Sequence, residues 1–259
     1  MPSANHISID SAKCVGCAEC VRDCPMSHLY LENGKARAHD GACLECGHCF
    51  AVCPQGAVDM TNYNTSVCGP AVPMSEFDSN RLLEAMRSRR SVRRFTSEPV
   101  SERELDMILE AGRCCPTAKN TQNVAYTVLG SKQEAIEREC VNLFRRASKL
   151  ASAFSETIRN VEIGDDFFFK GAPLAIVVSS DSEIDAALAS SYMELMAASL
   201  GLGAFYCGYF TACCRMSAKV RGMLALPEGH KAVTCLVVGH PAVEYKRTVP
   251  RKPLRKTVL

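Results

Sequence analysis

Apolar and polar positions along this chain follow two different periods. Helical spacing begins near Asn80 and recurs downstream, while three apolar runs rich in β-branched residues have strand length, at 124–129, 174–178 and 233–238. The most apolar long stretch spans residues 186–208, and its pattern predicts a buried core helix followed by a strand. Together these segments predict an α+β fold in which a sheet is flanked by helices.

Two serines predict helix N-termini in this region. Ser101 with Glu104, and Ser131 with Glu134, have the capping-box spacing, in which a serine and the glutamate three residues later exchange hydrogen bonds with each other's backbone N–H. We therefore expect helices to begin at these two serines.

Charge balance and the N-terminal residues narrow the class of protein. Lys and Arg number 30 against 28 Asp and Glu, so no global field recruits nucleic acid or an anionic membrane. Glu194, Gly201 and Gly203 interrupt the apolar stretch, which argues against a membrane-spanning segment. The first ten residues lack the basic and apolar regions of a secretory signal. We therefore expect a cytoplasmic protein with no nucleic-acid partner and no membrane partner.

Sixteen cysteines are many for this length, and eight of them fall in two identical patterns. Residues 14–25 read CVGCAECVRDCP and residues 43–54 read CLECGHCFAVCP, both C-x2-C-x2-C-x3-C-P. Each cysteine of the first run recurs 29 residues later, which marks an internal repeat. Three thiolates two residues apart can surround one face of an iron–sulfur cube, while the fourth, followed by proline, ligates the other cluster.

The spacing therefore predicts two [4Fe–4S] clusters whose ligands cross between the runs. One cluster is assigned Cys14, Cys17, Cys20 and Cys53, and the other Cys43, Cys46, Cys49 and Cys24. Zinc is the competing interpretation, because C-x2-C pairs also bind zinc. Two complete runs ending in Cys-Pro favour clusters, and residues 5–60 resemble a bacterial-type ferredoxin domain.

The remaining chain divides into a connector and a larger domain. Residues 61–79 contain Pro70 and Pro73 without sustained periodicity, so we expect a linker between a ferredoxin-type domain at 1–60 and a second domain at 80–259.

The second domain opens with an arginine-rich motif, RRSVRRF at residues 89–95. Guanidinium groups recognise phosphate bidentately and a serine hydroxyl adds a further bond. The candidates to hold one phosphate monoester are Arg89, Arg90, Ser91 and Arg93. From these residues alone, a solvated helix end or a nucleic-acid contact remains an alternative.

Four segments in this order resemble the nitroreductase family of FMN enzymes: RRSVRRF, PTAKNTQ at 116–122, GLGAFYCG at 201–208 and VPRKPL at 249–254. The resemblance covers residues 80–259 and implies an FMN-binding domain with a mixed sheet flanked by helices. It implies that the ribityl and phosphate end of FMN is bound by Arg89, Arg90, Ser91, Arg93 and Arg251. It implies that four further residues lie beside the isoalloxazine ring: Thr117, Ala118, Asn120 and Gln122. Asn120 is the expected hydrogen-bond partner of the ring. It also implies that a strand end lies near N5 and O4 of the flavin, and that this strand end is formed by Tyr206, Cys207 and Gly208.

The resemblance also implies an interlocked homodimer with each FMN at the subunit interface. The apolar helix expected at about 184–200, and the tail KRTVPRKPLRKTVL as an arm across a partner, agree with this. The chain departs from the family where Asn123 and Val124 follow Gln122, and it contains no tryptophan. The segment 140–170 falls where the family varies most and is expected to set substrate choice.

The combined picture is an FMN-dependent oxidoreductase that takes electrons through two [4Fe–4S] clusters and reduces an organic acceptor such as a nitroaromatic or quinone. The expected external donor is reduced ferredoxin or flavodoxin, or NAD(P)H. The alternatives are an NAD(P)H-fed flavin reductase, a reductive dehalogenase of the same family, and a non-enzymatic electron carrier or redox sensor.

Several conspicuous residues are interpreted as ordinary packing. Free cysteine is a common small buried hydrophobe, and aromatic runs usually pack in the core. The residues assigned to this class are Cys68, Cys114, Cys115, Cys140, Cys213, Cys214 and Cys235, together with Phe167, Phe168 and Phe169.

Overall fold

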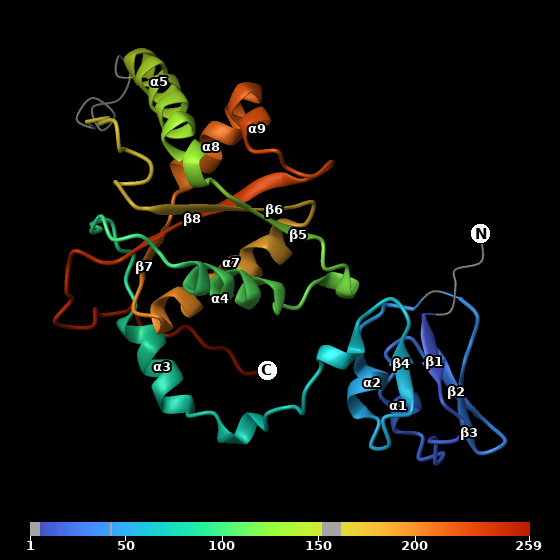
Figure 1. Ribbon diagram of the computed structural model, residues 1–259. Helices are drawn as coiled ribbons and strands as arrows, with labels where there is room; N and C mark the ends of the chain where they lie inside the picture. Colours follow the sequence, from blue (N-terminus) through green and yellow to red (C-terminus); the bar gives the residue numbers. More distant parts are fainter. Residues whose placement is uncertain (1–5, 42, 152–161) are drawn as a thin grey trace. The chain divides into compact units, whose positions relative to one another are not determined.

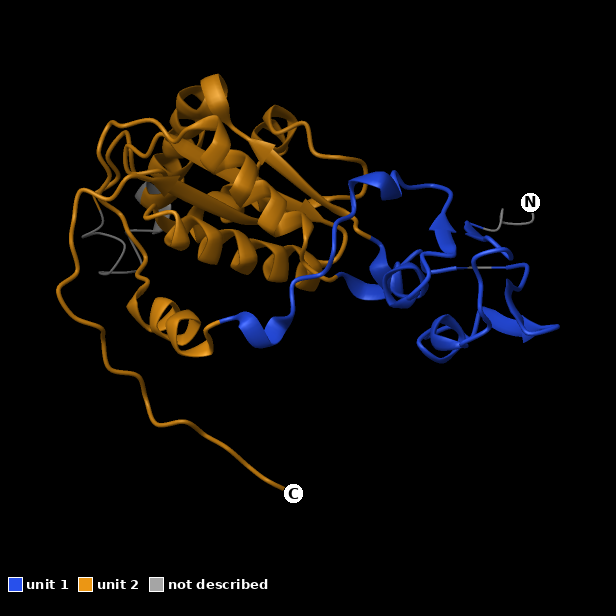
Figure 2. Ribbon diagram, turned by 60° about the horizontal axis from the view of Figure 1, so that its bottom comes forward, with its two compact units in different colours: residues 1–77, 117–121 blue, residues 78–116, 122–259 orange. Residues whose placement is uncertain are grey.

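The computed structural model describes residues 6–41, 43–151 and 162–259, and the chain forms two compact units (Figures 1 and 2). Unit 1 comprises the residues up to Phe77 together with Thr117–Thr121, and unit 2 comprises Asp78–Pro116 and Gln122–Leu259. The short segment Thr117–Thr121 therefore belongs structurally to the first unit, although the sequence places it inside the second domain.

Unit 1 shows the duplication seen in its cysteine pattern. Its elements are β1 (Ile7–Ile9), α1 (Glu19–Arg22), β2 (Leu29–Glu32), β3 (Lys35–Ala38), α2 (His48–Val52) and β4 (Val58–Met60), with short 3-10 turns η1 (Thr65–Val67) and η2 (Met74–Glu76). Strands β1 and β4 pair antiparallel, as do β2 and β3. The two short helices begin at equivalent places, because Ala18 and Gly47 precede them with left-handed φ angles of 64° and 75°.

Unit 2 is built on a four-stranded antiparallel sheet in the order β5-β6-β8-β7. The strands are β5 (Val124–Val128), β6 (Leu174–Ser180), β7 (Gly203–Tyr206) and β8 (Lys231–Gly239). The helices are α3 (Ser79–Ser88), α4 (Glu102–Arg113), α5 (Gln133–Ala151), α7 (Glu183–Ser199), α8 (Gly208–Met216) and α9 (Ala218–Met223), with turns η3 (Ala118–Asn120) and η4 (Gly130–Lys132).

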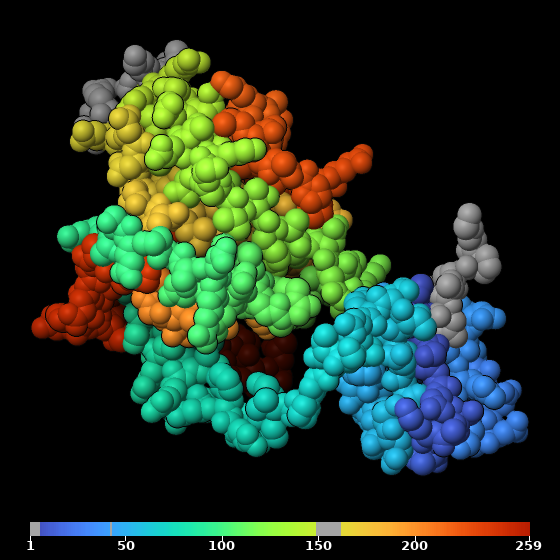
Figure 3. Space-filling view, in the orientation of Figure 1, coloured from blue at the N-terminus to red at the C-terminus, as the bar shows by residue number. Residues whose placement is uncertain are grey.

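Helices cover both faces of this sheet. Figure 1 shows α4 and α7 on one face and α5, α8 and α9 on the other, and the atoms of α4 and α5 are visible on the face of unit 2 drawn in Figure 3. Alternate residues of β6 enter separate cores: Val177 packs with the α5 and α8 side, and Ile176 and Val178 pack with the α4 and α7 side. Burial on both faces explains why β6 is apolar along most of its length.

The secondary-structure expectations are largely confirmed. Strands occupy all three predicted runs, and the stretch at 186–208 forms most of α7 followed by β7. The capping box at Ser101 and Glu104 is present. The prediction for Ser131 was wrong, because Ser131 lies inside the η4 turn and α5 begins at Gln133. The α+β class is confirmed, and the parallel component is an isolated bridge between Ser91 and Ala204.

The packing expectations hold for most of the residues concerned. Phe168 and Phe169 are buried in the α5-side core, with Phe167 packed against it. Of the seven cysteines expected to pack in a core, five are buried: Cys115, Cys140, Cys213, Cys214 and Cys235. Cys68 and Cys114 are exposed, which corrects the expectation that they pack in a core. In the described part of the chain, no helix is long and apolar enough to cross a membrane.

Candidate functional site

Two cavities of unit 1 are each lined by four cysteines. One cavity is lined by Cys14, Cys17, Cys20 and Cys53. The other is lined by Cys24, Cys43, Cys46 and Cys49. Each cavity thus combines the first three cysteines of one run with the fourth cysteine of the other, which is the grouping that the spacing predicts.

Local chain geometry produces this crossing. The third cysteine of each run, Cys20 or Cys49, is buried on the short helix that follows a left-handed residue, so the chain reverses around each cavity. The fourth cysteine then leaves the helix, and Pro25 or Pro54 after it contributes to the lining of a cavity. Because proline cannot continue the helix, the fourth sulfur turns toward the other cysteine run.

Backbone N–H groups point at four of these sulfurs. The Sγ atoms of Cys24 and Cys53 accept from the N–H of the residue four positions later, His28 and Ala57, both at 3.2 Å. Cys14 Sγ accepts from Ala36 at 3.4 Å, and Cys43 Sγ accepts from Glu45 at 3.3 Å. Such donors stabilise negative charge on sulfur and help to set the potential of a cluster bound there.

Hydrogen bonds from backbone N–H groups lower the pKa of a cysteine thiol in these cavities, whereas burial raises it. Hydrogen bonds from the Ala36 and Gly16 N–H groups lower the pKa of Cys14. Burial raises the pKa of the Cys49 thiol to about 11. Metal binding at the Cys49 sulfur therefore releases a proton at neutral pH, because the ligand is the thiolate.

The donor sets fit iron–sulfur clusters. Within the described residues, no group of three or more His, Cys, Asp or Glu side chains is arranged to bind a single metal ion. Each set of four cysteines lines a cavity instead. In a [4Fe–4S] cluster each thiolate binds a different iron, so the ligands surround a volume. Ile7, Leu29 and Val58 contribute apolar walls, which limit solvent access.

Unit 2 contains a cavity, open to solvent, beside the arginine motif. Its walls come from the end of α3, the middle of α7, the start of β7 and the segment after β8. The lining residues include Arg89, Arg90, Val92, Glu194, Gly203 and Tyr245. The two guanidinium groups in this wall supply donors for a phosphate.

Arg89 and Glu194 form an ion pair in this cavity. The Arg89 Nη1 donates to Glu194 Oε1 at 2.8 Å, and the Glu194 side chain is only 9% exposed. The neighbouring Tyr206 hydroxyl donates to the Ser190 carbonyl at 2.9 Å, and burial, with Glu194 nearby, raises the pKa of Tyr206. In the sequence, Glu194 is evident only as an interruption of an apolar stretch, although a charge inside such a helix signals a buried partner.

The rest of the RRSVRRF segment is held along the edge strand β7. Val92 N–H donates to the Ala204 carbonyl at 3.0 Å, and Ser91 forms the isolated parallel bridge with Ala204. The Arg93 guanidinium lies over the Phe205 ring, 5.6 Å from its centroid. The backbone of the motif is therefore fixed against the sheet, while Arg93 is exposed at its surface.

Tyr206, Cys207 and Gly208 form the junction between β7 and α8. Cys207 is the N-cap residue of α8 and makes no side-chain cap hydrogen bond. The positive end of the helix dipole therefore lies at Gly208, where it favours a partial negative charge on a ligand. Burial raises the pKa of the Cys207 thiol to about 11, so this side chain is neutral at physiological pH.

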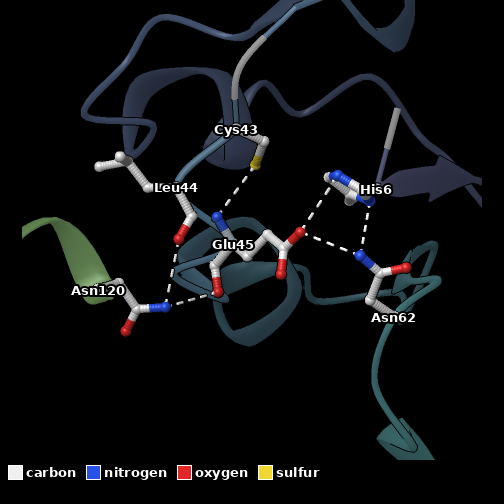
Figure 4. Close-up of polar contacts among 6 residues, drawn as sticks. All are labelled: His6, Cys43, Leu44, Glu45, Asn62 and Asn120. Carbon is white, nitrogen blue, oxygen red and sulfur yellow. Dashed lines mark hydrogen bonds and ion pairs between the residues drawn. The ribbon is translucent and has the colours of Figure 1, made fainter. Parts of the chain in front are cut away.

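The remaining predicted residues are not brought to this cavity. Thr117, Ala118 and Asn120 belong to unit 1, and Gln122 follows at the start of unit 2. Asn120 Nδ2 donates to the carbonyls of Leu44 and Glu45, at 3.2 and 3.0 Å, in the loop that carries Cys43 (Figure 4). Arg251 is exposed in the segment after β8 and does not line the cavity.

Family models match both parts of the chain. Residues 86–240 match the model described as the nitroreductase family, and residues 6–67 match a 4Fe-4S dicluster domain. An FMN reductase (NADPH) of Bacillus subtilis is 27% identical over 186 residues, which cover 63% of this chain and 67% of that protein. An uncharacterized ferredoxin of Methanocaldococcus jannaschii is 47% identical over 57 residues, covering 20% of this chain and 89% of that protein.

Solved structures of nitroreductases are similar to the larger part of this chain. A nitroreductase with bound FMN from Desulfitobacterium hafniense is 25% identical with a TM-score of 0.59, covering 70% of this chain and 100% of that chain. A nitroreductase with bound FMN from Bacteroides fragilis shares the fold, with 23% identity, a TM-score of 0.57 and coverage of 70% and 100%.

Proposed function

This chain belongs to the nitroreductase family, and from that premise we propose that it takes electrons through two [4Fe–4S] clusters and reduces an organic acceptor such as a nitroaromatic or quinone. It is an FMN-dependent oxidoreductase whose cofactors are FMN and two [4Fe–4S] clusters. The observation that carries the proposal is the presence, on one polypeptide, of two four-cysteine cavities and an arginine-lined cavity. Tethering raises the effective concentration of an electron donor near the flavin.

The proposed cluster ligands are the four cysteines of each cavity. One cluster is held by Cys14, Cys17, Cys20 and Cys53, and the other by Cys24, Cys43, Cys46 and Cys49. The grouping in the cavities supports this assignment, and so do the N–H donors at Cys14, Cys24, Cys43 and Cys53.

The proposed FMN site uses the arginine-lined cavity and the start of α8. Arg89 and Arg90 supply phosphate donors from the cavity wall, and Ser91 and Arg93 extend the same segment. The N-terminus of α8 at Gly208 is placed by β7 and offers backbone dipoles to the flavin N5 and O4 region. When bound, FMN supplies two-electron storage and hydride chemistry. The chain's own residues orient it, and Glu194 holds Arg89 in position.

We further propose that the protein is a homodimer and that the residues which bind FMN also include Thr117, Ala118, Asn120, Gln122 and Arg251, as the family resemblance implies. Exposed apolar residues on α7, Ile184, Leu188 and Tyr192, are spaced four residues apart and form one stripe. Such a stripe marks a protein interface on a helix that otherwise packs in the core. We also propose a cytoplasmic location, because eight of the sixteen cysteines are proposed cluster ligands and cysteine ligands of this kind are typical of a reducing compartment.

The test is anaerobic reduction of the purified holoprotein by reduced ferredoxin, compared with a cluster-deficient Cys14→Ser/Cys24→Ser double variant. We expect ferredoxin to reduce the FMN of the wild type and to fail with the variant, while added dithionite reduces both. Turnover of a nitroaromatic or quinone beyond one equivalent then separates an enzyme from an electron carrier. Equal FMN reduction by ferredoxin in both proteins would contradict electron entry through the clusters.

A nicotinamide-fed reductase is the second candidate, and similarity to an FMN reductase (NADPH) favours it. In that case NADPH or NADH reduces the FMN of the wild type and of the double variant at the same rate. Rapid-mixing measurements with each nucleotide, made without ferredoxin, decide between the two electron sources.

A further inference from the structure

The side chain of Asn120 holds the loop that carries Cys43. Its Nδ2 donates to two successive carbonyls, Leu44 O at 3.2 Å and Glu45 O at 3.0 Å (Figure 4). Asn120 is 76 residues from Leu44 in the chain and lies within the segment Thr117–Thr121 that belongs to unit 1. Both amide hydrogens are thus directed at the loop backbone.

One of these bonds reaches a cysteine sulfur through a single peptide group. The carbonyl of Leu44 and the N–H of Glu45 are the two ends of the same peptide, and Glu45 N–H donates to Cys43 Sγ at 3.3 Å. Donation to a carbonyl polarises the peptide and strengthens the bond that its N–H makes. Asn120 therefore acts on the Cys43 sulfur without touching it.

The backbone geometry shows that this contact is built into both segments. Lys119 and Asn120 have left-handed φ angles of 53° and 54°, and Glu45 has one of 52°. Asparagine adopts this conformation readily, whereas Lys119 and Glu45 hold it only where surrounding contacts fix it. The Glu45 carboxylate is fixed too, by Asn62 Nδ2 at 3.0 Å and by His6 Nε2 at 3.3 Å (Figure 4).

In the other cysteine run, a carbonyl of the equivalent loop accepts a hydrogen bond from a side chain that is closer in the sequence. The Cys14 carbonyl accepts from Lys35 Nζ at 2.5 Å, a residue 21 positions away on β3. The two loops are related by the internal repeat, yet only the Cys43 loop is bound by the Asn120 amide. A change at Asn120 should therefore distinguish the two clusters.

We propose that Asn120 is a positioning residue that fixes the Cys43 loop and raises the reduction potential of the cluster bound by Cys24, Cys43, Cys46 and Cys49. The inference rests on the proposed function for that ligand assignment. A stronger N–H bond to sulfur stabilises the more negative, reduced cluster, which raises its potential. Asn120, which the family resemblance assigns to the flavin ring, thus also adjusts one of the two clusters.

The test uses three variants of the full-length holoprotein. Asn120→Gly removes the amide and tolerates the left-handed backbone, and Asn120→Asp keeps shape and backbone preference but places a carboxylate against two carbonyl oxygens. Thr121→Ala is the matched control, because Thr121 is an exposed neighbour with an ordinary helical φ of −63°. The readouts are anaerobic redox titration followed by electron paramagnetic resonance, hydrogen–deuterium exchange, and iron and FMN content.

In Asn120→Gly, one of the two cluster potentials should become more negative, and in Asn120→Asp it should fall further, while the other stays unchanged. Exchange at residues 44–46 should become roughly tenfold faster after the loss of two hydrogen bonds, with no change at residues 15–17. Thr121→Ala should match the wild type.

Unchanged potentials in both Asn120 variants, or equal shifts of both clusters, would overturn the proposal. Loss of half the iron from Asn120→Gly would support it, because one loop alone depends on Asn120, whereas loss of all iron would count against it. Wild-type protein without iron would refute the proposed function instead, and the exchange comparison would still decide whether Asn120 holds the Cys43 loop.

Discussion

Arg89 at the end of α3 and Glu194 in the middle of α7 form an ion pair with an Nη1–Oε1 distance of 2.8 Å, although 105 residues separate them in the chain. Glu194 is almost fully buried and Arg89 is partly exposed, and among the described residues Arg89 is the one cation that forms an ion pair with this carboxylate. The pair attaches α3, and with it the RRSVRRF segment, to the helix that packs under the sheet.

Arg89→Ala should destabilise unit 2 by about 2 kcal/mol, because it leaves the buried Glu194 carboxylate unpaired. This loss is smaller than that for a fully buried ion pair, since Arg89 is partly exposed. The double variant with Glu194→Gln should recover most of that stability without recovering FMN affinity. Chemical denaturation and FMN titration measure the two effects. If the double variant is as unstable as the single one, the ion pair is not the source of the loss.

Arg90 and Arg251 should contribute to affinity for the phosphate group of FMN. Replacing either by alanine should weaken FMN binding by roughly tenfold or more, the effect of a charged hydrogen bond, and leave riboflavin binding unchanged. Arg94→Ala is the control, since Arg94 is exposed and lies outside the proposed set. Equal losses for FMN and riboflavin would place these arginines away from the phosphate.

The crossed cysteine grouping predicts which pairs of substitutions act on one cluster. Cys14→Ser with Cys53→Ser alters a single cavity and should remove about four irons, whereas Cys14→Ser with Cys24→Ser alters both cavities and should remove about eight. Cys68→Ser, at an exposed cysteine, should retain all iron. Iron and sulfide assays on anaerobically purified protein decide, and the reverse order of losses would mean that each run binds its own cluster.

Gly203 lies where β7 meets the RRSVRRF segment, and a side chain there has no room. A Cβ at Gly203 would stand 2.7 Å from Val92 Cβ and 2.8 Å from both Val92 methyl carbons. Gly203→Ala should therefore cost about 1–3 kcal/mol of stability and reduce FMN retention. Gly222→Ala in α9 meets nothing within 4 Å and should be neutral or stabilising. Thermal unfolding of both variants gives the comparison.

Glu137 should make stability depend on pH. Burial raises its pKa above the ordinary value of 4.5, although the carboxylate accepts hydrogen bonds from the N–H groups of Phe168 and Phe169. The folded chain therefore retains a proton that the unfolded chain has released, so stability is lost as pH rises from the unfolded pKa through the folded pKa.

Glu137→Gln keeps an acceptor for both N–H groups and removes the titration. The unfolding free energy of the wild type should fall relative to this variant as pH rises from the ordinary glutamate pKa through the raised pKa of Glu137, when both proteins are followed by circular dichroism from about pH 4 upward. Parallel pH profiles would show that Glu137 does not carry a raised pKa.

Short-range spacing determined much of this protein from the sequence alone. The grouping of four cysteines in each cavity follows from a spacing of two or three residues and a proline within each run, together with an exact repeat 29 residues later. Strand and helix positions followed from periodicity for the same reason, and β6 and α7 lie where the apolar pattern predicts. The family resemblance identified the arginine motif, but not the partner of its first arginine.

Only the tertiary structure decided which distant residues meet. The pairing of Arg89 with Glu194 and the contact of Asn120 with Leu44 join positions 105 and 76 residues apart. No local pattern encodes such contacts, because they depend on how packed elements bring separate chain segments together. Asn120 shows the consequence: its motif indicated a flavin contact, whereas folding directs its amide to two carbonyls of the Cys43 loop.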